Sequence, residues 1–324
     1  MARDPLVSVI IPVLNEARDL PACLDALLAQ RFPRERMEVL IVDGGSVDGT
    51  REVVAAYRGR FPHLRLLSNP EGTAGAGLNV GLRAARGKII VRVDGHTILE
   101  PDYIPRAVAI LQSGLADAVG GVLRPEGDTP TARVIAAVMA HPLGGGPAPF
   151  RHTTRPRRVD TVYLGVWRRE TLEEIGGFTP DVPANEDFEL YYRLRRAGKR
   201  ILCDPQLRSR TRVRRSWREL WRQYRRYGRG KARVLRRHPR SLRPRQVPPI
   251  LLAGLLPLSL LALPFPALRL PLLLLWGIYG GGTGWAAWRV ARRGGGIPWL
   301  RAWVTFWIMH WAWTLGFWEG ILLG

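Results

Sequence analysis

Three short apolar runs in the first hundred residues each end in an acid-bearing stretch, and this pairing limits what the chain can fold into. The runs cover residues 7–13, 39–42 and 89–93 and are rich in Val and Ile, which favours buried β-strands. Helical patterns separate the runs, so strand and helix signals alternate as they do in βαβ units. The alternation predicts an α/β fold with a mainly parallel sheet and helices on both faces.

The expected elements can be placed along the chain. Strands are expected over 7–13, 38–42, 64–67, 88–93 and 118–123, and helices over 20–30, 50–60, 76–85 and 103–113. From 127 to 158 the signals weaken, and the Gly-rich run 144–147 and the Arg/Pro run 155–158 are typical of loops.

Acidic residues lie where the strands are expected to end. Asn15-Glu16, Asp43 to Thr50 and Asp94-Gly95-His96 each follow a strand, and Glu186-Asp187 begins an expected helix over 188–197. In open α/β sheets the ligand crevice lies outside the carboxyl ends of the strands, so these polar groups should converge. The sequence therefore predicts an enzyme.

The net charge of +22 is concentrated in one block. Residues 208–245 contain seventeen Lys and Arg against one acid, Glu219. Such a block attracts nucleic acid and anionic lipid headgroups equally well. The remainder of the chain favours lipid, because the stretches 250–268, 270–290 and 298–323 are apolar and close to the roughly 20 residues that cross a bilayer.

These three stretches are expected to be transmembrane helices, with two alternatives. Prolines 257, 264, 266 and 271 could turn the first two stretches into a re-entrant hairpin, and all three could instead form a buried helical core. Basic flanks favour a cytoplasmic amino-terminal domain. No signal peptide is expected at the start, and Cys23 and Cys203 lack metal-type spacing, which suits a reducing compartment and no zinc site.

The basic block itself is expected to contain an interfacial helix. Residues 216–219 have capping-box spacing, and apolar or aromatic side chains then recur on one helical face. That face would place its rings at the headgroup boundary while arginines contact lipid phosphates. The alternative is a solvated basic helix face. Together these features divide the chain into a cytosolic domain (1–206), a basic interfacial region (207–246) and a membrane region (247–324).

Four motifs in this order resemble the family-2 glycosyltransferases, which have a GT-A nucleotide-sugar fold. They are Val7 to Glu16 (VSVIIPVLNE), Ile41 to Thr50 (IVDGGSVDGT), Asp94-Gly95-His96 and Asn185-Glu186-Asp187. The resemblance covers residues 5–230, and with the basic helix and the apolar stretches it extends to exopolysaccharide glucosyltransferases of the succinoglycan type.

The resemblance implies a nucleotide site. Pro12 would turn the chain toward the ligand, and the carboxylates of Glu16 and Asp43 would accept hydrogen bonds from uracil and ribose. Asn79 lies in the segment 72–81, which matches the family loop beneath the nucleotide and sugar. The alternative for Asp43 to Thr50 is a tight turn with helix capping. A Gly-rich dinucleotide site over 72–81 is discounted, because the run does not directly follow a strand.

A divalent cation is implied at Asp94 and His96. The usual family motif has two aspartates, and here the second is a histidine. Alternate side chains of an extended stretch share a face, so both could reach one Mn²⁺ or Mg²⁺ ion that neutralises the diphosphate leaving group. The imidazole nitrogen favours Mn²⁺. The alternative is a hydrogen-bonded loop histidine.

The resemblance also implies the catalytic groups. Asp187, ahead of Glu186, would deprotonate the acceptor hydroxyl, and the displacement would invert the anomeric configuration. Acids in a first helical turn also occur simply because they complement the helix dipole. Gln223 and Arg226 resemble a diphosphate-binding element of membrane-bound relatives, with Tyr227 in place of a Trp.

These expectations define a membrane-anchored inverting glycosyltransferase at the cytoplasmic face of the plasma membrane. It would move a hexose, with glucose from UDP-glucose favoured, onto a lipid-linked saccharide. A polyprenyl-phosphate acceptor is the alternative reaction, and an inactive membrane scaffold is the alternative without catalysis. Nucleic acid is not an expected partner, because the apolar stretches argue against it.

Overall fold

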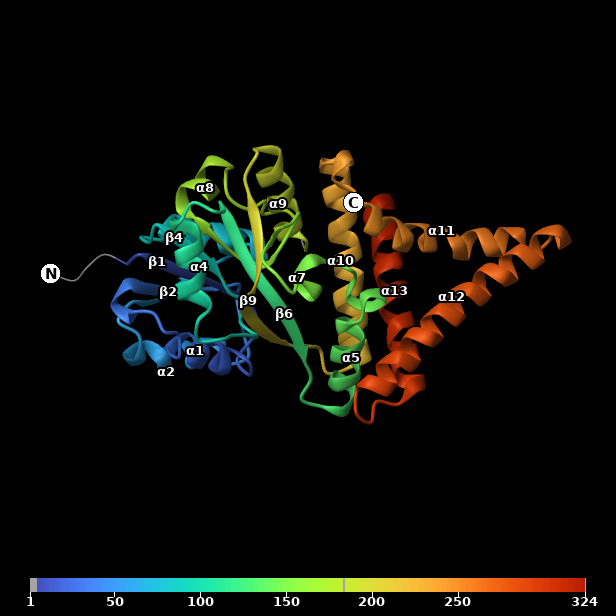
Figure 1. Ribbon diagram of the computed structural model, residues 1–324, viewed down its shortest axis with the longest axis horizontal. Coiled ribbons are helices and arrows are strands. Elements are labelled where there is room, and N and C mark those ends of the chain that lie inside the picture. The colour runs from blue at the N-terminus through green and yellow to red at the C-terminus, as the bar shows by residue number, and fades with distance from the viewer. Residues whose placement is uncertain (1–4, 183, 324) are drawn as a thin grey trace. The chain divides into compact units, whose positions relative to one another are not determined.

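The computed structural model describes residues 5–182 and 184–323, which form two compact units. The first unit runs to Arg124 and resumes over Ala148–Arg212, and the second comprises Pro125–Pro147 and the chain from Val213 onward. Figure 1 shows strands gathered in the first unit and long helices in the second.

One nine-stranded sheet organises the first unit. Its order is β3 (Leu64–Ser68), β2 (Met37–Asp43), β1 (Val7–Val13), β4 (Ile89–Arg92), β8 (Tyr163–Arg168), β6 (Ala118–Glu126), β9 (Ile201–Arg212) and β5 (Thr97–Leu99), with β7 (Arg157–Arg158) paired to β9. The first four strands are parallel, which confirms the βαβ prediction. The pairs β4–β8, β6–β8, β5–β9 and β7–β9 are antiparallel, so the expectation of a mainly parallel sheet holds for one half only.

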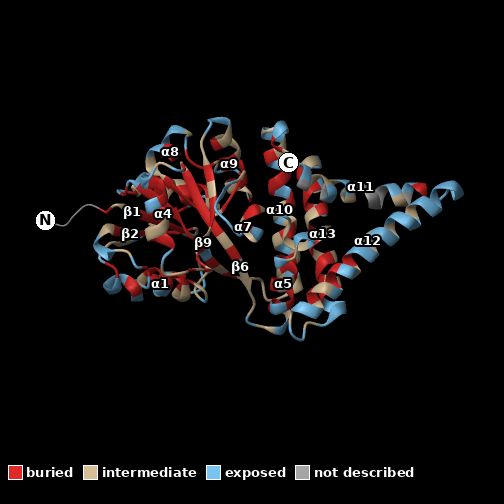
Figure 2. Ribbon diagram, viewed as in Figure 1, coloured by how far each residue is buried: buried red, intermediate tan, exposed pale blue. Residues whose placement is uncertain are grey.

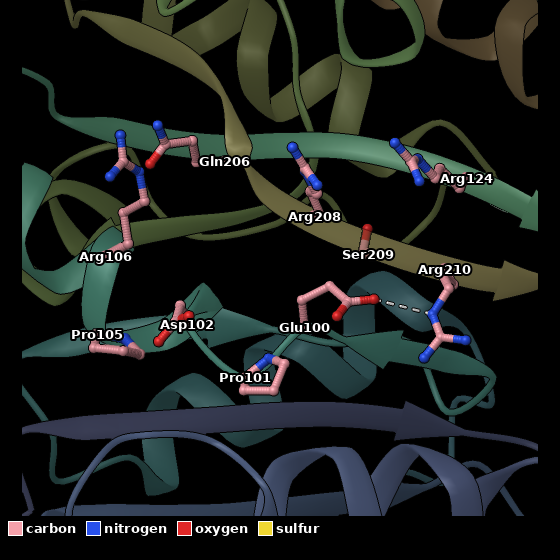
Figure 3. A pocket seen from close by; sticks show the side chains of 10 residues that line it. All are labelled: Glu100, Pro101, Asp102, Pro105, Arg106, Arg124, Gln206, Arg208, Ser209 and Arg210. Atoms are coloured by element: carbon pink, nitrogen blue, oxygen red, sulfur yellow. Dashed lines mark hydrogen bonds and ion pairs between the residues drawn. The ribbon is translucent and has the colours of Figure 1, made fainter.

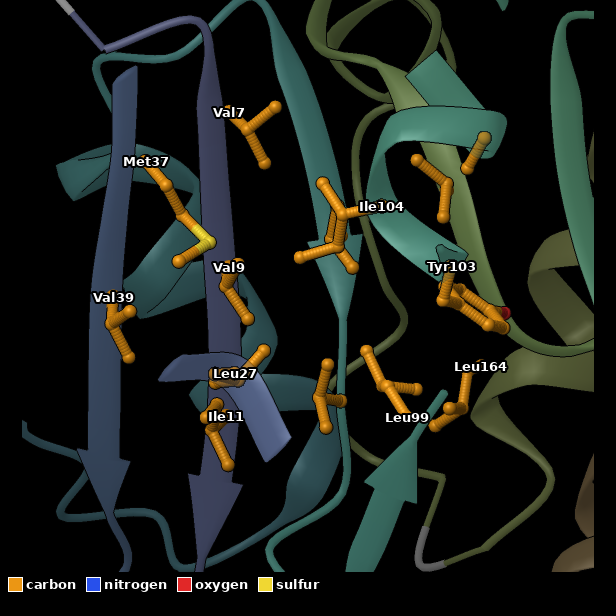
Figure 4. Packing of buried hydrophobic residues seen from close by; sticks show 14 of the residues in the cluster. Val7, Val9, Ile11, Leu27, Met37, Val39, Leu99, Tyr103, Ile104 and Leu164 are labelled. Carbon is orange, nitrogen blue, oxygen red and sulfur yellow. The ribbon is translucent and has the colours of Figure 1, made fainter. Parts of the chain in front are cut away.

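Helices cover both faces of the sheet, so that the central strands β1, β2 and β4 are buried on both sides. Val7, Val9 and Ile11 of β1 pack into one hydrophobic cluster, while Ile10 packs into another, as the two-residue period of a strand requires. Figure 4 shows the first cluster, and Figure 2 shows the central strands as buried.

The helices that supply these two clusters belong to opposite faces. The first cluster receives α1 (Leu20–Leu28), α2 (Thr50–Tyr57) and α4 (Tyr103–Gln112), and the second receives α3 (Ala74–Ala84), α8 (Arg169–Glu174) and α9 (Glu186–Arg196). Short 3-10 turns, η1 (Arg34–Arg36) and η2 (Arg58–Arg60), lie beside β2 and after α2.

The segment with weak signals is more ordered than we expected. It contains α5 (Pro130–Ala140), α6 (Pro142–Gly145) and α7 (Pro149–His152). The side chain of Thr129 caps α5 by accepting from the amide of Ala132, with proline at the first helical position. The expected loops at 144–147 and 155–158 therefore hold the end of α6 and the short strand β7.

The second unit is a helical assembly around α13 (Trp299–Leu322). Its other long helices are α10 (Trp217–Arg237), α11 (Val247–Ala262) and α12 (Pro266–Arg293), with 3-10 turns η3 (Pro239–Ser241) and η4 (Pro244–Gln246) between them. Helices α10 and α13 approach closely at glycines. A Cβ on Gly228 would lie 2.0 Å from the carbonyl oxygen of Trp313, and one on Gly316 would overlap the carbonyl oxygen of Arg225.

This packing changes the interpretation of α10. The helix begins at Trp217, and the Ser216 hydroxyl accepts from the amide of Glu219 at 3.3 Å, as the capping-box spacing predicted. However, Leu220 and Tyr224 lie in the cluster formed with α13, and Gly228 contacts α13 directly. The helix face that we expected at a lipid headgroup boundary is therefore covered by protein.

The prediction of C-terminal transmembrane helices is wrong. Across 5–182 and 184–323, none of the helices combines the length and the apolar content that crossing a bilayer requires. Helix α11 has 16 residues, fewer than the about 20 that span a hydrocarbon core. Helix α12 is longer but includes Arg269 and ends in Arg292 and Arg293, and α13 includes Arg301 and Glu319.

Candidate active site

The loops that follow β1 and β2 are tied together by hydrogen bonds. The Asn15 amide donates to Ser46 Oγ at 2.8 Å, and Asn15 Oδ1 accepts from the amide of Val47 at 2.9 Å. The Glu16 amide donates to Thr50 Oγ1 at 2.9 Å. Asn15 has a φ of 56°, a left-handed conformation that Asn tolerates better than most residues. The two loops are therefore held together at the carboxyl ends of neighbouring parallel strands.

Asp43 is the last residue of β2 and is almost completely buried. Its Oδ1 accepts from the amide of Ser46 at 3.0 Å, and its Oδ2 accepts from Arg51 Nε at 2.6 Å. Burial alone would raise the pKa of this carboxyl, but the hydrogen bonds from Ser46 and Arg51 outweigh it and lower the pKa below the ordinary value. Asp43 is thus an ionised group at the loop's base.

Asn79 and Pro12 have defined structural surroundings. Asn79 on α3 donates from Nδ2 to the carbonyl of Phe178 at 2.7 Å and accepts from the Phe178 amide at 2.8 Å. This amide therefore joins α3 to the segment after α8. Pro12 lies in β1 opposite Val42, and a Cβ on Gly77 of α3 would come within 3.4 Å of it. Contacts of Pro12 and Asn79 with a nucleotide stay predictions.

An arginine outside the four motifs holds two of the predicted acids together. Arg92, the last residue of β4, donates from Nε to Asp94 Oδ1 at 3.1 Å, and its Nη2 lies 2.8 Å from Glu186 Oε1. Only 11% of the Arg92 side chain is exposed. Its other terminal nitrogen, Nη1, is buried and has no hydrogen-bond partner within the described chain. The signal in the sequence was a lone charge inside the apolar run 89–93.

Asp94 is held in the ionised form. Burial raises the pKa of its carboxyl, but the guanidinium of Arg92, then His96 and a hydrogen bond from Tyr163, lower it below the ordinary value. Tyr163 OH, on β8, donates to Asp94 Oδ2 at 3.2 Å and lies 2.9 Å from Thr97 Oγ1. Tyr163 is a second site residue that sequence reasoning missed, because nothing local marks a tyrosine within a strand.

The pKa of Asp187 is shifted in the opposite direction from that of Asp94. It lies in the first turn of α9, where its Oδ1 accepts from the amide of Phe188 at 2.7 Å. Burial and the neighbouring carboxylate of Glu186 raise the pKa of Asp187 to about 6, against the opposing effect of Arg92. A carboxyl with a pKa near the working pH suits proton transfer. Two neighbouring carboxyls, Asp94 and Asp187, thus have pKa values shifted in opposite directions.

His96 connects the cluster to the loop after β1. Its Nδ1 lies 2.8 Å from Glu16 Oε1, and donation from Nδ1 would leave Nε2 as the acceptor nitrogen. A carboxylate that holds an imidazole in this way is the usual support of a metal-binding histidine. Within the described residues, no group of three or more His, Cys, Asp or Glu side chains gathers as a metal site. Asp94 and His96 therefore fit a cation only if ligand oxygens complete its coordination.

The remaining predicted residues lie in the second unit. Gln223 and Arg226 are on α10, and Gln223 Nε2 donates to Tyr227 OH at 2.8 Å. Their expected contact with a diphosphate stays a prediction. In the first unit, Arg92 joins Asp94 to Glu186, beside which lies Asp187. Glu16 contacts His96, and the hydrogen-bonded loops connect the segment that contains Glu16 to Asp43.

A half-parallel α/β sheet with acids at its strand ends is the arrangement expected of a GT-A-like fold. Residues 8–176 match the family described as Glycosyl transferase family 2, and the chain belongs to this family. Motif order and fold agree with that assignment.

Similarity to individual proteins extends over most of the chain. The chain is 29% identical to the succinoglycan biosynthesis protein ExoA of Rhizobium meliloti, over 99% of this chain and 98% of that protein. It is 25% identical, over 71% of this chain and 74% of the relative, to a dolichyl N-acetyl-α-D-glucosaminyl phosphate 3-β-D-2,3-diacetamido-2,3-dideoxy-β-D-glucuronosyltransferase of Methanococcus voltae. A mannosyltransferase of Pyrobaculum calidifontis, solved with GDP-Man and Mn²⁺, has a TM-score of 0.62 at 22% identity, covering 99% of this chain and 88% of that one. This last likeness supports the fold.

Proposed function

We propose that this family-2 glycosyltransferase transfers a hexose, with glucose favoured, from a UDP-sugar to a lipid-linked saccharide, with inversion at the anomeric carbon. The observation that carries the proposal is the cluster in which Arg92 joins Asp94 to Glu186 while the carboxyl of Asp187 has a raised pKa. The full-length likeness to a succinoglycan biosynthesis protein supports glycan assembly as the setting. The Methanococcus relative, named for a dolichyl-linked sugar, supports a lipid-linked acceptor.

Each residue of the cluster has a distinct role in this proposal. Asp187 removes the proton from the acceptor hydroxyl as that oxygen attacks the anomeric carbon from the face opposite the nucleotide. Asp94 and His96 would hold a divalent cation, which, when bound, neutralises charge on the departing diphosphate. Arg92 keeps Asp94 and Glu186 in place. Glu16 fixes the tautomer of His96.

The alternative acceptor is a polyprenyl phosphate, which is already an anion and needs no strong base. Replacing Asp187 with Asn separates the two reactions. Near-complete loss of turnover supports a sugar hydroxyl as the nucleophile, whereas turnover close to that of the unchanged protein supports a phosphate. Absence of both donor hydrolysis and transfer with Mn²⁺ present would instead support an inactive scaffold.

Donor identity is tested first, by calorimetry of the purified chain with UDP-glucose, UDP-galactose, GDP-mannose and dTDP-glucose, each with Mn²⁺. We expect tightest binding for a UDP-sugar, and preference for GDP-mannose would overturn the assignment. We also propose the cytoplasmic face of the plasma membrane as the place of reaction, since a lipid-linked acceptor remains in the membrane. Cell fractionation followed by transfer assays of each fraction tests this location.

A further inference from the structure

The first unit contains a pocket that none of the predicted site residues line. Its volume is about 690 Å³, and its walls come from the segment after β5, the start of α4, and the strands β6 and β9. This volume lies within the range of small-ligand sites. The predicted donor and catalytic residues lie before β5, on α9 or on α10, and none of them lines the pocket, so it is a separate feature of this unit.

One wall of the pocket is strongly basic, because several arginine side chains lie along it. Gln206, Arg208 and Arg210 occupy alternate positions of β9, so their side chains share one face of the strand. Arg124, near the end of β6, adds a third guanidinium, and Arg106 of α4 adds a fourth. Figure 3 shows Arg106, Gln206, Arg208 and Arg124 along one side, with Glu100 and Asp102 opposite.

Two of the four arginines are fixed by carboxylates. Arg106 Nη2 lies 2.9 Å from Oδ2 of Asp204, whose side chain is only 3% exposed. Arg210 Nε lies 3.1 Å from Glu100 Oε1 across the pocket, as the dashed line in Figure 3 marks. These pairs hold the wall in position and neutralise two of its charges.

The other two arginines have no such neutralisation. Arg208 donates from Nε to the carbonyl of Pro205 at 3.3 Å, which orients its guanidinium but leaves the charge uncompensated. Neither Arg124 nor Arg208 pairs with a carboxylate anywhere in 5–182 or 184–323. Asp102, the remaining acid of the lining, is paired with Arg31 at 3.0 Å. The pocket thus contains two guanidinium groups, those of Arg124 and Arg208, without a carboxylate partner, and a bound anion would neutralise their charge.

We propose that this pocket binds a carboxylate or phosphate group carried by a saccharide, with Arg124 and Arg208 contacting the anion. The guanidinium fork matches both kinds of oxyanion bidentately. The volume exceeds what a bare anion needs, the Gln206 amide can bond sugar hydroxyls, and Pro101 and Pro105 supply apolar surface for the pyranose ring. The saccharide part of the inference rests on the proposed function, whereas the anion part rests on the lining alone.

The test is calorimetric titration of the purified full-length chain, without donor, using inorganic phosphate, glucuronic acid and glucose. We expect both anions to bind more tightly than glucose. In the double variant Arg124→Gln/Arg208→Gln the Kd for the anions should rise at least about tenfold, because two charge-assisted contacts are lost. Tighter binding of glucuronic acid identifies a carboxylated sugar, and tighter binding of phosphate identifies a phosphorylated one.

The matched control is Arg58→Gln/Arg83→Gln, which removes two exposed arginines of the same unit away from the pocket. Its anion affinity should equal that of the unchanged chain, and circular dichroism confirms that both double variants are folded. Equal anion affinity in all three proteins, or glucose binding as tightly as glucuronic acid, overturns the proposal. Either result would leave the proposed UDP-sugar transfer untouched. Conversely, if the unchanged chain binds the anions as expected but shows no sugar transfer, only the proposed function is contradicted.

Discussion

Asp187→Asn should abolish catalysis and stabilise the fold. The side chain accepts a hydrogen bond from the amide of Phe188, and the Asn Oδ1 atom can keep that bond. The substitution therefore removes a proton acceptor with little change of shape. General-base catalysis typically contributes about 10²- to 10⁴-fold to a rate, so kcat should fall by that order for a hydroxyl acceptor. Donor affinity should change little.

The stability gain follows from the pKa of the same carboxyl. Burial and the charge of Glu186 raise the pKa of Asp187 from 3.8 to about 6. The native carboxyl thus binds its proton more tightly than the unfolded one, and the native state loses stability as pH rises through this interval. Above about pH 6 the ionised carboxyl lowers the free energy of unfolding by at most about 3 kcal/mol, since each tenfold change in proton affinity corresponds to about 1.4 kcal/mol. Asn does not titrate and avoids this cost.

Urea unfolding of both proteins at about pH 4.5 and about pH 7.5 measures the effect. The variant should be the more stable protein at the higher pH, and its advantage should shrink at the lower pH. Transfer by the unchanged enzyme should decline as pH falls below about 6, because the base becomes protonated. Glu170→Gln, an exposed first-turn acid of α8, is the control and should leave stability and activity unchanged. A variant less stable than the parent at both pH values would refute the reasoning.

Three further changes test other parts of the structure. Arg92→Gln should reduce kcat/KM at least about 10²-fold, and Arg92→Lys should rescue only part of it, because one ammonium cannot replace a fork that spans two carboxylates; equal activity of both variants would contradict this. His96→Ala should raise the Mn²⁺ concentration for half-maximal activity about tenfold or more, measured by metal titration of the transfer rate. Gly121→Ala should lower the free energy of unfolding by at least about 3 kcal/mol, since its Cβ would overlap the carbonyl oxygen of Leu207, while Gly59→Ala meets nothing and should be close to neutral.

The parallel half of the sheet could be predicted because its signals are local. β1 has the bounds we expected, and the alternation of its side chains between two clusters follows from strand geometry. The antiparallel half depends on pairings between distant segments, such as β4 with β8 and β5 with β9. No local pattern states which distant strand will lie beside another, so that half emerged only from the structure.

The C-terminal third was misread because apolar content alone does not identify the surrounding medium. The sequence shows rings and leucines on one face of α10, and lipid was one environment that could cover them. In the structure α13 covers that face, and the close approach requires Gly228 and Gly316. Glu319 of α13 accepts from both Arg225 and Arg229 of α10. The paired glycines and the single acid in an apolar stretch were the signals of helix packing.

The acids of the site could be predicted one by one, but their charge balance could not. Glu186, Asp187 and Asp94 come together in a buried place, and carboxylates so close would repel one another without a cation. Arg92 supplies that cation from within β4, where an uncompensated charge would be too costly to bury. A lone arginine in an apolar strand therefore implies buried acids elsewhere in the chain. For Arg92 these partners are Asp94, two residues along the chain, and Glu186, which only the fold brings close to it.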